Sequence, residues 1–257
     1  MSKSTEHVPP AVLDLARRAR RVAVLTGAGM SAESGVPTFR DAQTGLWERY
    51  DPMALATPEA WDEDPPLVWA WYAWRIRLLR DVEPNPGHRA LAEWDARAGE
   101  VDLAVVTQNV DDLHERAGSR SAVHLHGSLG EFRCSRCHEP YRGDVEVPTQ
   151  PVERLDPPSC ERCGGPVRPG VVWFGEALPT GAFERAEQIV GGADLALVVG
   201  TSGLVYPAAG LPMIARARGV PVVEVNPGET DLSDAVHHVW RASAATALPA
   251  LVAALTV

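Results

Sequence analysis

The sequence predicts an α/β fold, with a Rossmann-like parallel sheet domain and a smaller inserted zinc-ribbon domain. Two observations support this prediction: apolar runs that each end in a polar turn, and two Cys-x2-Cys pairs in a stretch of different composition. The apolar runs are RVAVLTGAG at 21–29, DLAVVTQN at 102–109, DLALVVGTS at 194–202 and PVVEVNPG at 221–228. Such runs, bounded by turns and separated by helix-length stretches, are typical of buried parallel strands.

The polar turns after these runs are expected to lie close together. In open α/β sheets the ligand crevice lies beyond the carboxyl ends of the strands. A single turn of this kind is explained equally well as chain punctuation, but four together indicate a nucleotide site. The residues expected at this edge are Gly27, Gln108, Asn109, Thr201, Ser202 and Asn226.

The first of these turns resembles a dinucleotide fingerprint. TGAGMSA at 26–32 matches G-x-G-x-x-A, in which glycines let backbone amides approach a pyrophosphate. The second strand and terminal acid that complete this fingerprint in dehydrogenases are missing. The chain continues as ESGVPTFRD at 33–41, a polar loop suited to closing over a cofactor and excluding water. This favours chemistry other than hydride transfer.

Residues 128–170 are rich in Cys, Pro, Gly and Arg and form the predicted insert. Two Cys-x2-Cys pairs, separated by 22 residues, match the four-thiolate tetrahedral shell of structural Zn²⁺, which leaves no position open for water or substrate. Two disulfides or a redox Cys-x-x-Cys are the alternatives. The four expected ligands are Cys134, Cys137, Cys160 and Cys163.

The length of 257 residues suits one large domain, or one domain that carries a smaller insert. Hydrophobic content of 45% and charged content of 23% are typical of a soluble globular protein. The expected organisation is a flexible N-terminus at 1–10, a Rossmann-like domain at 11–127 and 171–257 with a helical segment at 40–85, and a zinc-binding module at 128–170.

The net charge of −10 argues against direct nucleic-acid binding, which needs clustered Lys and Arg, and favours encounter with lysine-rich proteins. The start MSKSTEHVPP has no apolar core of a secretory signal, so a cytoplasmic location is expected. The uncharged stretch 195–215 is about as long as a membrane span, but Gly and Pro interrupt it. We therefore predict a strand, a loop and a helix there, and no membrane association.

Several motifs occur in an order that resembles the sirtuin family, and the resemblance covers nearly all of residues 20–250. They are GAGMSAESGVPTFR at 27–40, TQNVDDLH at 107–114, HLHG at 124–127, the paired Cys-x2-Cys, WFGE at 173–176, GTS at 200–202 and VNPG at 225–228. The resemblance implies an enzyme that uses NAD to remove acyl groups from protein lysines, yielding nicotinamide and O-acyl-ADP-ribose. It also implies a structural zinc ion and acylated proteins as partners.

The resemblance implies a set of cofactor-binding residues between the two lobes. Asn109 and Asp111 are also expected to be catalytic, by hydrogen-bonding the nicotinamide amide and the ribose; capping of a helix that starts near Asp111 is the alternative role. Ala244 matches the family pattern more loosely. The full set is Gly27, Ala28, Gly29, Arg40, Gln108, Asn109, Asp111, Gly200, Thr201, Ser202, Asn226 and Ala244.

His126 is the candidate catalytic base, because it precedes the glycine in the family pattern and an imidazole is largely neutral at physiological pH. In a strand-like run, His124 and His126 point to one face while Val123 and Leu125 face the core. Without the resemblance, a structural histidine is the commoner explanation.

The segment Pro65–Arg80 is predicted as a helix, with Val68, Tyr72, Arg75 and Leu79 on one face. If this face lines the acyl pocket, Arg75 and Tyr72 suit a carboxylate. Tyr72-x-x-Arg75 is similar to the pair that marks the desuccinylase and demalonylase branch, bacterial class III, and the resemblance adds Ala56 and Phe174 as substrate-binding residues. The alternative is an arginine that extends to solvent and pairs with Asp64 or Glu83.

Two other functions fit parts of the sequence. One is a binding protein that senses NAD or ADP-ribose, and the other is an ADP-ribosyltransferase that directs the same activated ribose to a protein side chain. The Tyr72 and Arg75 pair favours deacylation with a preference for succinyl and malonyl groups, and with acetyl groups also accepted.

Overall fold

The computed structural model describes residues 7–36, 45–97 and 101–256. Its centre is a six-stranded sheet of order β3-β2-β1-β7-β8-β9 in which all neighbours are parallel. The strands are β1 Arg21–Thr26, β2 Asp102–Thr107, β3 Ala122–His124, β7 Leu195–Val199, β8 Val222–Val225 and β9 His238–Trp240. The predicted parallel sheet is confirmed, and the four apolar runs supply its four central strands.

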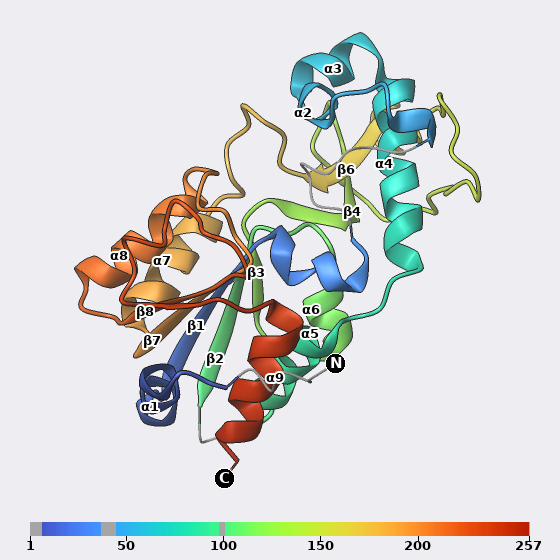
Figure 1. Cartoon of the computed structure of the whole chain (residues 1–257). Coiled ribbons are helices and arrows are strands. Elements are labelled where there is room, and N and C mark those ends of the chain that lie inside the picture. The colour runs from blue at the N-terminus through green and yellow to red at the C-terminus, as the bar shows by residue number, and fades with distance from the viewer. Residues whose placement is uncertain (1–6, 37–44, 98–100, 257) are drawn as a thin grey trace.

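The sheet is buried on both faces, which explains why its strands are continuously apolar. On one face, α1 (Pro10–Arg18), α5 (Pro86–Asp95) and α9 (Ala244–Ala254) pack against Val24 and its neighbours. On the other face, α7 (Ala182–Gly192) and α8 (Leu211–Ala217) cover Ala23 and Leu25. Figure 1 shows these two helical layers on either side of β1, β2 and β7.

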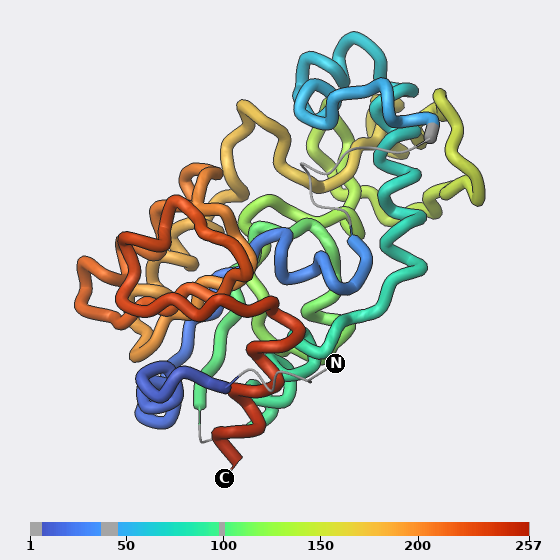
Figure 2. The backbone as a smooth tube through the Cα atoms, viewed as in Figure 1, coloured from blue at the N-terminus to red at the C-terminus, as the bar shows by residue number. Residues whose placement is uncertain are grey.

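A second body contains a three-stranded antiparallel sheet of order β5-β4-β6. Its strands are β4 Gly127–Cys134, β5 Pro140–Tyr141 and β6 Val167–Val171. The helical segment that packs on it comprises η3 Gly45–Trp47, α2 Pro52–Leu55, α3 Pro58–Glu63 and α4 Pro65–Arg80. Figures 1 and 2 show this body above the parallel sheet, with α4 running from it toward the sheet.

Aromatic residues join the helical segment to β4 and to the loop that follows β6. Trp69 of α4 meets Phe132 of β4 at a ring distance of 5.9 Å, and Trp61 of α3 meets Trp173 at 5.6 Å. Asp64 receives two hydrogen bonds from Arg154, at 2.5 and 2.7 Å. We propose that residues 45–80 of the predicted helical segment form one body with the module at 128–170, although they lie in the chain between parts of the predicted Rossmann-like domain.

The uncharged stretch after residue 194 forms β7, the turn η4 (Ala208–Gly210) and α8, as predicted. Within residues 7–36, 45–97 and 101–256, no helix has the length and apolar character needed to span a bilayer.

Candidate active site

The turn after β1 packs directly on the turn after β7. The amide of Gly29 donates to the Gly200 carbonyl at 2.8 Å, and the amide of Gly27 donates to Val199 at 3.1 Å. A Cβ on Gly29 would lie 2.7 Å from the Gly200 Cα, so side chains would force the two turns apart. Gly200 also has φ +62°, which favours glycine. The glycines thus bring two strand ends together, besides any approach to a phosphate.

Asn109 and Asp111 meet at Ser31, which lies between η1 (Ala28–Met30) and η2 (Ala32–Ser34). The Asn109 Nδ2 group donates to the Ser31 hydroxyl and to the Gly27 carbonyl, both at 3.1 Å. The Ser31 hydroxyl donates to Asp111 at 2.9 Å. Burial raises the pKa of Asp111, and all three side chains are under 10% exposed. Asp111 also accepts from the amide of Leu113, the first residue of α6 (Leu113–Ala117), at 3.1 Å, although the N-cap of that helix is Asp112.

Each of the two histidines of HLHG hydrogen-bonds a backbone carbonyl, and the two carbonyls belong to consecutive residues. His126 Nδ1 lies 3.0 Å from the Gln108 carbonyl, and His124 Nδ1 lies 3.1 Å from the Asn109 carbonyl. A carbonyl only accepts, so each Nδ1 carries the proton. Neutral His126 therefore has its lone pair on Nε2. Leu125 is buried in the core as predicted, although β3 ends at His124.

The surroundings push the pKa values of these histidines apart. Burial lowers the pKa of His126, opposed by its hydrogen bond to Gln108. Burial also acts to lower the pKa of His124, but Glu115, whose carboxylate lies 2.8 Å from Nε2, raises it above the ordinary value. His124 is therefore engaged as an ion pair, while His126 is available as a neutral base.

The remaining nucleotide-edge residues gather around Thr201. Its hydroxyl accepts from Gln108 Nε2 at 3.1 Å, and its carbonyl accepts from Asn226 Nδ2 at 3.1 Å. Ala244 begins α9 and is buried against Gly87 of α5, while α9 also contacts the η1 turn. Arg40 falls outside the described residues.

Trp173 connects the predicted acyl-pocket residues. Its indole Nε1 donates to the Tyr72 hydroxyl at 2.8 Å, and the two rings stack at 6.3 Å. Burial raises the pKa of Tyr72 to about 12, opposed by the positive charge of Arg75. Burial lowers the pKa of Arg75. On the other side, the Phe174 amide donates to the Ala56 carbonyl at 3.0 Å, so Ala56 lies against the same loop.

The two acids considered as surface partners of Arg75 bind other arginines. Asp64 pairs with Arg154 and also caps α4 through the Leu67 amide. Glu83 pairs with Arg116 at 3.3 Å. Both acids are thus paired with arginines of other segments.

The four cysteines form one cluster with all sulfurs within 4.8 Å of one another. The Sγ atoms of Cys134 and Cys163 are 3.5 Å apart, and those of Cys137 and Cys160 are 3.7 Å apart. These separations exceed a disulfide bond of about 2.05 Å. They match the sulfur spacing of about 3.8 Å expected for tetrahedral Zn²⁺ with Zn–S bonds of about 2.3 Å. The cluster is therefore a structural zinc site.

A family model described as the Sir2 family matches residues 27–207. The chain belongs to the Sir2 family, the sirtuins. This sirtuin is 54% identical over 252 residues to NAD-dependent protein deacylase 2 of Corynebacterium efficiens, covering 98% of this chain and 99% of that protein. It is also 54% identical over 231 residues to an NAD-dependent protein deacylase of Mycobacterium tuberculosis, covering 90% and 96% respectively.

Solved structures agree with this assignment. A Sir2 homolog–NAD complex matches with TM-score 0.88 and 44% identity, covering 99% of this chain and 96% of that chain. A Sir2 variant with a deacetylated p53 peptide and 3'-O-acetyl ADP ribose matches with TM-score 0.80 and 34% identity, covering 94% and 96% respectively.

Three residues that the sirtuin places at the site were not selected from the sequence. Ser31 connects Asn109 to Asp111, and His88 Nε2 lies 3.5 Å from its hydroxyl. His114 Nε2 lies 3.1 Å from the Thr26 hydroxyl. Ser31 lies inside the glycine-rich motif, which was the available signal. The sequence around His88 and His114 does not indicate that they contact Ser31 and Thr26.

His88 and His114 predict a loss of stability in acid. Burial lowers their pKa values to about 3 and about 4, and the Nδ1 atoms of both are buried without a hydrogen-bond partner among the described residues. Below pH 6.5 the unfolded chain therefore binds protons that the folded chain does not, and stability falls with pH. Between pH 7.5 and 5.5 the two together cost about 3 kcal/mol of unfolding free energy.

Urea unfolding of wild type and a His88→Asn, His114→Gln double variant at both pH values measures this contribution. The double variant is expected to lose about 3 kcal/mol less than wild type over that interval. An equal loss in both proteins contradicts the assignment.

Proposed function

We propose that this sirtuin is an NAD-dependent protein deacylase that releases nicotinamide, free lysine and O-acyl-ADP-ribose. The observation that carries the proposal is the contrast between His124 and His126. The two imidazoles hold neighbouring carbonyls, but only His126 keeps a free Nε2 lone pair and a lowered pKa. This is the arrangement that a general base requires at neutral pH.

NAD, when bound, supplies an activated ribose carbon that receives the acyl oxygen as nicotinamide leaves. His126 Nε2 takes a proton from a ribose hydroxyl, and the Gln108 carbonyl holds the ring through Nδ1. Both Nδ2 hydrogens of Asn109 are engaged, so its Oδ1 remains to accept a hydrogen bond from the nicotinamide amide. Asp111, which is held beside Asn109 through Ser31, would bind the ribose.

We further propose that the acyl group carries a carboxylate, so that succinyl and malonyl groups are preferred and acetyl groups are also removed. Trp173 donates to the Tyr72 oxygen, which directs the Tyr72 proton toward another acceptor. The raised pKa of Tyr72 keeps that proton in place. Arg75, near enough to influence that pKa, adds a cation. A donor beside a guanidinium suits a carboxylate.

The partners on this proposal are proteins that carry acylated lysines, and the net charge of −10 favours lysine-rich segments over nucleic acid. Four thiols arranged for zinc are typical of a reducing compartment, which supports the cytoplasm. On this proposal the residues named above bind NAD. Arg40 remains a prediction from the resemblance.

A panel of succinyl-, malonyl-, glutaryl- and acetyl-lysine peptides, incubated with the protein and NAD, tests the proposal. Mass spectrometry is expected to show loss of the acyl mass, with one nicotinamide and one O-acyl-ADP-ribose formed per lysine released. The acidic acyl groups should react with a higher kcat/KM than acetyl. A peptide that instead gains ADP-ribose would identify a transferase, and no nicotinamide at all would identify a binding protein.

A further inference from the structure

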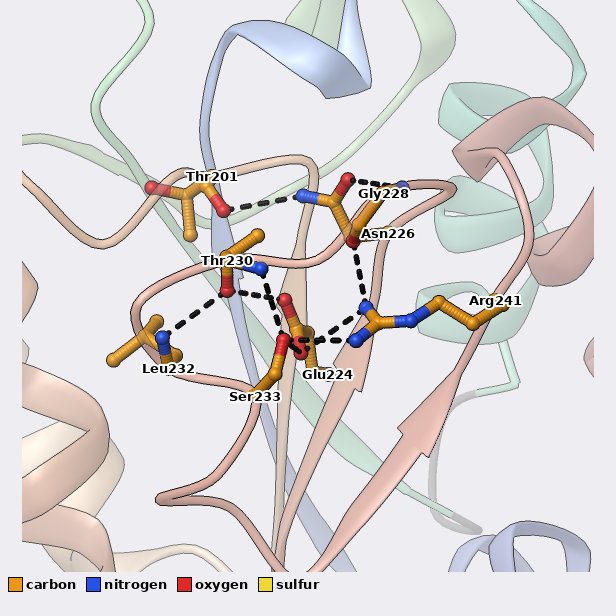
Figure 3. Close-up of polar contacts among 8 residues, drawn as sticks. All are labelled: Thr201, Glu224, Asn226, Gly228, Thr230, Leu232, Ser233 and Arg241. Atoms are coloured by element: carbon orange, nitrogen blue, oxygen red, sulfur yellow. Dashed lines mark hydrogen bonds and ion pairs between the residues drawn. The ribbon is translucent and has the colours of Figure 1, made fainter.

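Strand β8 contains a buried carboxylate. Glu224 is 1% exposed and lies between the valines of VVEV. A buried carboxylate without partners costs several kcal/mol. Glu224 accepts hydrogen bonds from the Thr230 hydroxyl at 2.5 Å and the Ser233 hydroxyl at 2.7 Å, and it pairs with Arg241 at 3.4 Å (Figure 3). All three partners follow Glu224 in the chain.

These contacts fold the cofactor-edge loop, residues 226–233, back onto the sheet. Arg241 also donates to the Gly228 carbonyl at 2.6 Å and to the Ser233 hydroxyl at 2.9 Å. Within the loop, Leu232 alone is buried. Leu232 anchors the loop in the core cluster that also contains Ala23 and Leu25, and the polar network around Glu224 holds the rest of the loop.

The other end of this network reaches the nucleotide edge. Asn226 donates to the Thr201 carbonyl at 3.1 Å and accepts from the Gly228 amide at 3.3 Å. Gly228 is in turn held by Arg241, which pairs with Glu224, as Figure 3 shows. The orientation of Asn226 thus depends on a carboxylate that lies beneath the loop and is closed to solvent.

We propose that Glu224 is a positioning residue for NAD: with Arg241, it holds the cofactor-edge loop in the form that presents Asn226 to the dinucleotide. The inference rests on the proposed use of NAD and extends it to residues outside the binding surface. His126 and Tyr72 lie on other segments and make none of these contacts. The network therefore acts on the affinity for NAD and leaves the chemical step and the acyl pocket unchanged.

The test compares KM and kcat in the full chain. Glu224→Gln is expected to raise the KM for NAD by about 10-fold while kcat and the KM for acyl-peptide change by less than about 2-fold. Arg241→Gln changes a half-exposed residue and is expected to raise the KM for NAD by about 5-fold. An unchanged KM for NAD in both variants overturns the proposal.

A double-variant cycle shows whether Glu224 acts through Asn226. If it does, Glu224→Gln combined with Asn226→Ala has a KM for NAD within about 2-fold of Asn226→Ala alone. If the two effects multiply, Glu224 does not act through Asn226 and the proposal fails.

Asp95→Asn is the matched control for a general loss of rigidity. Asp95 is also a buried carboxylate, 4% exposed, but it binds Arg120, which lies just before the amino end of β3. β3 is the outermost strand on the side of the sheet away from β8 and β9. Its substitution should lower the Tm without changing the KM for NAD; an equal rise in KM overturns the proposal.

Calorimetric binding of NAD without peptide gives the same comparison without turnover. A wild type that binds NAD but does not deacylate thus refutes the proposed function alone.

Discussion

Replacing His126 with asparagine is expected to lower kcat/KM for deacylation by about 10²–10⁴-fold, the usual contribution of a general base. Asparagine keeps an N–H donor for the Gln108 carbonyl, which His126 binds at 3.0 Å, but lacks the Nε2 lone pair. The chain around Gln108 should therefore keep its position while proton transfer is lost. Free lysine and nicotinamide are measured together, with circular dichroism and zinc content reporting the fold.

His124→Asn is the matched control, because it preserves the donor to the Asn109 carbonyl and removes the ion pair with Glu115. It should cost less than about 10-fold in kcat/KM. Comparable losses in the two variants contradict the assignment of His126 as base. In wild type, burial lowers the pKa of His126, so the acid limb of kcat/KM is expected below pH 6.5.

Arg75→Met is expected to reduce kcat/KM on succinyl-lysine peptide by about 10–100-fold, as for loss of a charged hydrogen-bond pair, and to spare acetyl-lysine within about 3-fold. Methionine fills much of the same volume on α4 without a charge. The selectivity between the two acyl groups, measured as a ratio of kcat/KM values, therefore isolates the guanidinium.

Tyr72→Phe refines this prediction. It keeps the stacking with Trp173 and removes only the hydroxyl that Trp173 binds at 2.8 Å. A loss of about 5-fold on succinyl-lysine alone is expected. If either variant loses activity equally on succinyl- and acetyl-lysine, the acidic-acyl pocket is wrong.

Local pattern was sufficient for much of this fold. The run around Val24 predicts β1 because a strand buried on both faces must be apolar throughout. The helix α4 was predicted with the bounds Pro65–Arg80, since proline marks its start and an apolar period runs along it. The cysteine spacing predicted the cluster that the four sulfurs form.

Contacts between distant segments could not be predicted in this way. The packing of Trp69 on Phe132 joins residues from two different predicted domains, and no periodicity in either segment records it. The partners of Ser31 come from a strand end far along the chain. In the sequence, Glu224 resembles any polar residue near a strand end. Its role becomes evident only in the structure, where the Thr230 and Ser233 hydroxyls donate to it.

A crystal of the wild-type protein with bound NAD measures the relation on which the proposed chemistry depends. The prediction is that a hydroxyl of the ribose attached to nicotinamide lies about 2.6–3.2 Å from His126 Nε2, directly or through one water, with Nδ1 still on the Gln108 carbonyl. A ribose bound out of reach of that imidazole, with His126 turned into the core, would contradict it.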